Sequence, residues 1–135
     1  MGTFMENAKE DLWPSNLAEE PSDRSPLQIL REQAERLGEK TSNVVEAVVA
    51  AEPHLDGSTL DIQFSLVAPA LGGYEYVLLR ARQPVVDLYP VRLEFEGNSW
   101  TANEEDGLKQ YLANFFNSAR TRKIISNLVA QSRSA

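Results

Sequence analysis

Residues 60–66 read LDIQFSL, so apolar and polar side chains alternate strictly along this segment. A period of two places the apolar side chains on one face of a β-strand and the polar ones on the other. The segment therefore predicts a strand buried on one side only, which is typical of an antiparallel sheet with one covered face.

Three further strands are expected around it. Residues 43–52 hold a β-branched run, residues 74–82 are rich in aromatic and aliphatic residues, and residues 91–96 alternate again and end at Gly97-Asn98. The segment 83–90 contains two prolines and is expected to follow a sheet edge. Turn residues separate these segments, which predicts a four-stranded, mainly antiparallel meander.

A helix is expected before the sheet. Ser25 can cap it by accepting from the backbone N–H of Gln28, and Pro26 suits the first helical position. Apolar residues then recur at helical spacing, at Leu27, Leu30, Ala34 and Leu37. Gly38 is expected to end the helix in a left-handed conformation, and Glu32 and Arg36 to pair on its exposed face.

Two helices are expected after the sheet. Asn103 can cap the first, whose apolar stripe comprises Leu108, Tyr111, Leu112, Phe115 and Phe116. A break at Asn117-Ser118 precedes the second, which carries Ile124, Ile125, Leu128 and Val129. We interpret the stripe, together with Trp100, as core rather than as a cofactor site. The chain is thus predicted to be an α+β domain with both C-terminal helices packed on one sheet face.

Composition excludes several classes of function. The chain has 135 residues, no cysteine and one histidine, His54, so thiolate metal sites, iron–sulfur clusters and multi-histidine sites are excluded. We expect no metal and no cofactor. No apolar run approaches the roughly 20 residues of a membrane span, so we expect no membrane partner and a cytoplasmic location.

The N-terminal 24 residues are expected to form an acidic, flexible tail ahead of a single domain at 25–135. They carry six acidic and two basic residues and show no periodicity. Leu12 and Trp13, followed by Leu17, form a short apolar element within the tail. One hypothesis is that it docks on a partner or on the domain; the other, which we favour, is a disordered leader whose Trp13 packs loosely on the domain surface.

Candidate binding residues lie on the third expected strand. Simple alternation puts Tyr74, Tyr76, Arg80 and Arg82 on one face, where Arg92 of the next strand could join them. Tyrosine and arginine are enriched at binding hot spots, and arginine suits carboxylate and phosphate groups. The alternative is structural, with the arginines pairing across strands to Glu46, Asp61 or Glu94.

Catalytic signatures are sparse. Gly72-Gly73 lacks the Lys-Ser/Thr of a phosphate-binding loop, and no G-x-S-x-G element occurs. His54 lies in a loop near Asp56 and Asp61, where a histidine–carboxylate pair could act as a general base. Turn formation by Asp56-Gly57 explains that aspartate without a catalytic role, and we favour this interpretation. We predict no catalytic residues.

The sequence thus leaves two hypotheses about function. The first is a non-catalytic protein-interaction module, accessory, antitoxin- or immunity-like, that binds a partner through its acidic surface and the Tyr/Arg face. The second is a binding protein or enzyme for a small anionic ligand, with a pocket between sheet and helices. We expect another protein as the partner, with a homodimer as a further alternative. Nucleic acid is not expected as a partner at a net charge of −7, despite the basic C-terminal helix.

Overall fold

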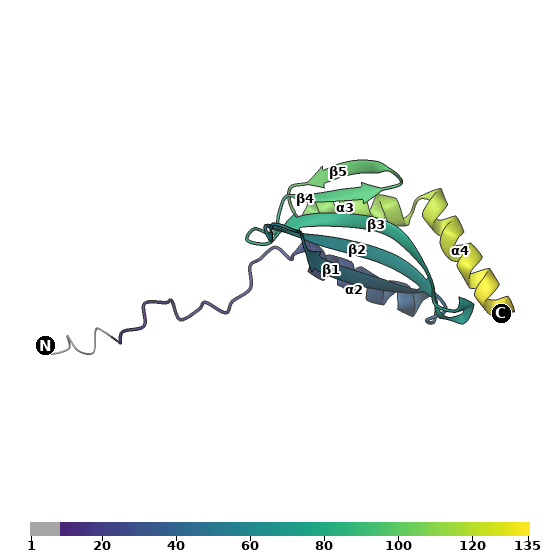
Figure 1. Cartoon of the computed structure of the whole chain (residues 1–135), viewed down its shortest axis with the longest axis horizontal. Coiled ribbons are helices and arrows are strands. Elements are labelled where there is room, and N and C mark those ends of the chain that lie inside the picture. Colours follow the sequence, from purple (N-terminus) through teal and green to yellow (C-terminus); the bar gives the residue numbers. More distant parts are fainter. Residues whose placement is uncertain (1–8) are drawn as a thin grey trace, which may run out of the picture.

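The computed structural model describes residues 9–135, which fold as one helix, five strands and two further helices (Figure 1). The elements, in chain order, are α2 (Pro26–Lys40), β1 (Glu46–Pro53), β2 (Thr59–Ala68), the short 3-10 helix η1 (Pro69–Leu71), β3 (Tyr74–Pro84), β4 (Val91–Phe95), β5 (Asn98–Ala102), α3 (Glu105–Phe116) and α4 (Ala119–Ser134).

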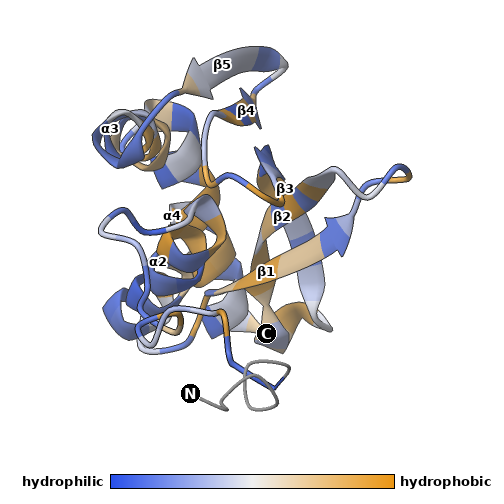
Figure 2. Ribbon diagram, turned by 90° about the vertical axis from the view of Figure 1, so that its left-hand side faces the viewer, coloured by the Kyte–Doolittle hydropathy of each residue, from blue (hydrophilic) through white to orange (hydrophobic). Residues whose placement is uncertain are grey.

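The five strands form one antiparallel meander in the order β1-β2-β3-β4-β5. Helices α2, α3 and α4 lie on the same side of the sheet and leave the other face open (Figure 2). The predicted α+β class is therefore confirmed. No helix within residues 9–135 is both long enough and apolar enough to cross a membrane.

The strand count was predicted wrongly, as four instead of five. Glu96 and Gly97 both adopt positive φ, 50° and 80°, and make a two-residue turn after which Asn98 pairs with Phe95. Such a turn suits the twist of an antiparallel hairpin. The chain therefore returns as β5 where the sequence had suggested that the sheet ends, and Trp100 lies opposite Leu93 on β4.

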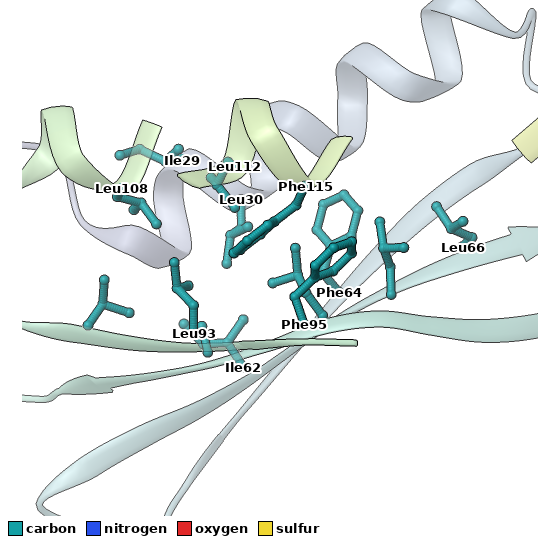
Figure 3. Packing of buried hydrophobic residues seen from close by; sticks show 14 of the residues in the cluster. Ile29, Leu30, Ile62, Phe64, Leu66, Leu93, Phe95, Leu108, Leu112 and Phe115 are labelled. Atoms are coloured by element: carbon teal, nitrogen blue, oxygen red, sulfur yellow. The ribbon is translucent and has the colours of Figure 1, made fainter. Parts of the chain in front are cut away.

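The core fills the space between the sheet and the helices (Figure 3). Phe115 of α3 is 4% exposed, and its ring lies 4.4 Å from that of Phe95 and 4.9 Å from that of Trp100. Phe116 contacts Phe64 of β2 with ring centroids 5.5 Å apart. The aromatic stripe is thus packed against the sheet, as the core interpretation predicted.

Helix α2 begins as predicted and ends later than predicted. Ser25 accepts a hydrogen bond from the backbone N–H of Gln28 at 3.1 Å. Gly38 does not end the helix, which continues to Lys40. Gly38 has no positive φ, and a Cβ on it would lie 3.0 Å from Oδ1 of Asn43, so this glycine lies inside the helix close to that side chain and not in a left-handed turn.

The caps of the C-terminal helices differ from each other. Glu104, not Asn103, precedes α3, and it makes no side-chain capping bond. The predicted break after α3 is confirmed, since Ser118 caps α4 by accepting from the backbone N–H of Thr121. The side chain of Glu105 in the first turn of α3 instead reaches back to residue 24, where the tail joins the domain.

Candidate functional site

The open face of the sheet carries the three predicted arginines. Arg80 lies opposite Gln63 on one side and Glu94 on the other, and Arg82 lies opposite Asp61 and Arg92. Directly opposed residues of an antiparallel pair point to the same face. Arg80, Arg82 and Arg92 therefore share the face that no helix covers.

A bulge in β3 separates the two tyrosines from these arginines. Leu79 pairs with Phe64 and Val77 with Ser65, so Leu78 is an extra residue on β3. One extra residue reverses the alternation beyond it. Tyr76 consequently pairs with Leu66 on the helix-covered side and packs against the core, and Tyr74 pairs with Ala68 on that side and is 52% exposed. The expectation that all four side chains share one face is wrong.

The open face holds a shallow concave surface of about 510 Å³ whose charges nearly cancel. Its ionisable lining residues are Glu52, Asp61, Arg80, Arg82, Arg92 and Glu94. Nε of Arg82 donates to Oδ1 of Asp61 at 2.7 Å. Arg92 lies directly opposite Arg82 and donates to Oγ of Ser99 at 3.4 Å. Three basic and three acidic groups give this lining a formal net charge of zero, so neither sign of charge is in excess.

His54 joins this network through Asp61 rather than Asp56. Its Nδ1 lies 2.9 Å from Oδ2 of Asp61. The hydrogen bonds from His54 and Arg82 lower the pKa of Asp61. Asp56 accepts from the backbone N–H of Ser58 at 2.9 Å and from its hydroxyl at 2.8 Å, which is the turn-forming role that the sequence had allowed.

His54 and Asp61 thus belong to a set of side-chain hydrogen bonds that extends across β2 and β3 to Arg82. In residues 9–135 no group of three or more histidine, cysteine, aspartate or glutamate side chains is placed to hold a metal ion.

A second concave surface lies on the helix side of the sheet, and we call it the groove. It encloses about 550 Å³ between α2 on one side and α3 and α4 on the other, above β2 and β3. Its floor is apolar and comprises Ile29, Leu37, Phe64, Leu66, Leu78, Leu112, Phe116 and Ile125. Figure 3 shows Ile29 and Leu112 on the helices above Phe64 and Leu66 on the sheet. The groove is thus lined mainly by apolar side chains, whereas the concave surface of the open face is lined mainly by charged ones.

Four cations border the groove, and no aspartate or glutamate lines it in the described structure. Arg24 and Lys109 are both bound by Glu105: Nζ of Lys109 lies 2.7 Å from Oε2, and Nε of Arg24 lies 3.5 Å from the same atom. Arg36 lies 3.9 Å from Glu39 in an exposed pair, and Lys40 makes no ion pair within residues 9–135. Arg36 has only this long, exposed pair and Lys40 has none in the described part of the chain, so the rim cations are least neutralised at the Arg36 and Lys40 end.

Glu105 fixes the other end of the groove. It accepts from the backbone N–H of Arg24 at 2.7 Å and from Lys109, and these bonds lower its pKa to about 2. The guanidinium of Arg24 also donates a hydrogen bond to the carboxylate of Glu32. Glu32 therefore pairs with Arg24, and the predicted ion pair between Glu32 and Arg36 does not form. Tyr89 donates its hydroxyl to the carbonyl of Arg24 at 2.8 Å, and burial raises the pKa of Tyr89 to about 12. Residue 24 is therefore held firmly at the rim.

The groove residues were not predicted as a site. The spacing of Gln33, Arg36, Leu37 and Lys40 places them on neighbouring positions of one helix face. That pattern is visible in the sequence, but it also describes an ordinary solvent-exposed helix edge. The opposite wall, from Lys109 to Ile125, could be found only once the helices were placed.

The apolar element of the tail lies outside any site in the structure. Leu12, Trp13 and Leu17 are 85%, 73% and 60% exposed. They do not dock on their own domain, and docking on a partner stays a prediction.

Comparison of the chain with protein-family models, with curated proteins and with solved structures finds no match. Function must therefore be argued from the residues themselves.

Proposed function

We propose that this protein is a non-catalytic interaction module whose groove binds an acidic, apolar segment of a partner protein. One observation carries the proposal. An apolar floor is bordered by four cations, Arg24, Arg36, Lys40 and Lys109, in a chain whose net charge is −7. Burial of apolar side chains on the floor would supply affinity, and the cations would select an acidic segment and orient it.

Charge distribution supports the groove as the docking surface. An acidic segment is repelled by a surface of the same sign and attracted where positive charge gathers. Arg36 and Lys40 lie one helical turn apart on α2 and border the apolar floor together. A segment with acidic residues beside two or three large apolar ones matches both features of this rim.

The open face of the sheet is the weaker of the two surfaces. Its three arginines face an equal number of carboxylates, and Arg82 is already bound to Asp61. Arg80, Arg82 and Arg92 remain predicted partner-binding residues. If that face is used, Arg80→Glu should weaken the complex, whereas the groove proposal expects little change.

Site-specific photo-crosslinking tests the proposal. A benzophenone amino acid is introduced at Gln33, which lines the groove, or at Gln63, which lines the open face. Each variant is irradiated in extract of the source cells, and crosslinked peptides are sequenced by mass spectrometry. We expect Gln33 to capture a segment with acidic and large apolar residues, and Arg36→Glu/Lys40→Glu to abolish that product.

The matched control is Arg122→Glu/Lys123→Glu, which makes the same change of charge at two exposed positions of α4 that do not line the groove. It should leave the Gln33 product intact. Capture at Gln63 alone, or capture at Gln33 that survives reversal of Arg36 and Lys40, would contradict the proposal.

A small anionic amphiphile is a second candidate ligand, favoured by the size of the groove. Its volume of about 550 Å³ falls within the roughly 300–1,000 Å³ of small-molecule sites. Native mass spectrometry of the protein purified from its source would show a small adduct that is lost on denaturation. Dodecanoate serves as the probe: it should bind the unmodified protein and the Arg122→Glu/Lys123→Glu variant, but bind the Arg36→Glu/Lys40→Glu variant more weakly.

A further inference from the structure

The tail carries an apolar element for which the domain offers no partner in the structure. We call Leu12, Trp13 and Leu17 the hook. All three are more than half exposed, at 85%, 73% and 60%. Exposure of one large apolar residue is ordinary, but three within six residues of the mostly polar segment 9–24 form a candidate binding element.

We propose that the hook of one copy docks in the groove of a second copy, and that two copies exchange hooks. The inference rests on the proposed function in that both place an acidic, apolar segment in the same groove. It names one such segment, residues 9–22 of this chain.

The charges of hook and groove are complementary. Residues 9–22 contain four acidic residues, Glu10, Asp11, Glu19 and Glu20, and one basic residue, Lys9. These acids flank the hook on both sides, as the rim cations flank the apolar floor. Opposite charge beside an apolar contact speeds encounter and selects against segments that lack the acidic residues.

The length of the tail suits the exchange. Trp13 lies 11 residues before Arg24, and an extended chain of that length spans roughly 36–40 Å. The groove follows α2 from Ile29 to Lys40, a helical rise of about 16 Å. A hook can therefore leave its own domain, reach a neighbouring groove and lie along it.

The direction of the tail favours a second copy over the chain's own groove. Arg24 is held at the rim by Glu105, Glu32 and Tyr89, so the tail starts from a fixed point. From there residues 9–23 extend away from the body of the domain (Figure 1). When two copies exchange hooks, each hook occupies the groove of the other copy and no hook or groove is left unoccupied. The result is a closed two-fold dimer and not an open chain of molecules.

Sedimentation equilibrium of the full chain tests the exchange. We expect a mass of twice 15.1 kDa at micromolar concentration. Trp13→Ala and Arg36→Glu/Lys40→Glu should each weaken the dimer by at least tenfold, and Arg122→Glu/Lys123→Glu should not. A 1:1 mixture of the Trp13→Ala and Arg36→Glu/Lys40→Glu variants should regain dimer, because one intact hook and one intact groove remain.

Fluorescence of Trp13 separates exchange from other outcomes. In a Trp100→Phe background, Trp13 is the only tryptophan, and its emission should shift to shorter wavelength as dimer forms. A shifted emission in a monomer, independent of concentration, would show docking within one chain and overturn the exchange. A monomer with water-exposed Trp13, or a dimer that survives Trp13→Ala, would also overturn it.

The failure of this inference is distinguishable from failure of the proposed function. The Trp13→Ala variant keeps the whole groove, so partner capture at Gln33 should persist in it. Capture without a hook-dependent dimer would leave the groove as a partner site and remove only the exchange. A monomeric unmodified protein that also gives no capture at Gln33 would remove both proposals.

Discussion

Removal of the Phe115 side chain should strongly destabilise the domain. Phe115 is 4% exposed and stacks on Phe95 at 4.4 Å and against Trp100 at 4.9 Å. Truncation of a buried phenylalanine to alanine costs about 3–5 kcal/mol, because apolar contact is lost and a cavity remains. For about 110 folded residues, this predicts a decrease in Tm of about 13–21 °C.

Thermal and urea unfolding followed by circular dichroism measures this effect. The control is Tyr74→Ala, which truncates an aromatic side chain that is 52% exposed and should change stability by less than about 1 kcal/mol. A Phe115→Ala variant with nearly unchanged melting would refute the core assignment. Unchanged melting together with loss of dimer mass would show instead that the aromatic stripe is an interface.

Three further predictions concern α2 and its contacts. Ser25→Ala should lower stability by about 0.5–2 kcal/mol in urea unfolding, since the capping bond to Gln28 is lost. Gly38→Ala should raise Tm in thermal unfolding, because alanine favours a helix over glycine by about 1 kcal/mol and the atom 3.0 Å from the added Cβ is the end of the exposed Asn43 side chain, which can rotate away; a lower Tm would show that Asn43 cannot move. Glu105 has a folded-state pKa of about 2 against an ordinary value of 4.5. The stability that its ionised carboxylate contributes is therefore complete above about pH 5 and is lost as pH falls toward 2. Urea unfolding at several pH values should therefore show that, below pH 5, the free energy of unfolding depends less steeply on pH in Glu105→Gln than in the unmodified protein. The same dependence in both proteins would contradict the hydrogen bonds assigned to Glu105.

Local patterns predicted much of the fold. The alternation in LDIQFSL identifies β2, and the capping residue at Ser25 identifies the start of α2, because both depend only on neighbours in the chain. The fifth strand was missed because the turn at Glu96-Gly97 contains a non-glycine residue at positive φ, which residue preferences disfavour.

The candidate site was less predictable, since it depends on tertiary contacts. The prediction that the tyrosines and arginines share one face is wrong because of a single extra residue, Leu78, on β3. The alternation of apolar and polar residues along β3 does not reveal this bulge. The three open-face arginines were found because they lie on one side of that bulge. The groove required the relative placement of three helices, and only the α2 half of its rim, Arg36 and Lys40, follows a pattern along the chain.

Binding of an anionic apolar dye to the groove tests the central claim most directly. The measurement is a fluorescence titration with 8-anilinonaphthalene-1-sulfonate, made on variants that still unfold cooperatively. Reversal of two exposed cations exchanges two attractions of about 0.5 kcal/mol each for similar repulsions, a change of about 2 kcal/mol or about 30-fold in Kd. We predict this weakening for Arg36→Glu/Lys40→Glu and less than about threefold for Arg122→Glu/Lys123→Glu. Equal Kd values for the two variants would contradict the groove as the binding site.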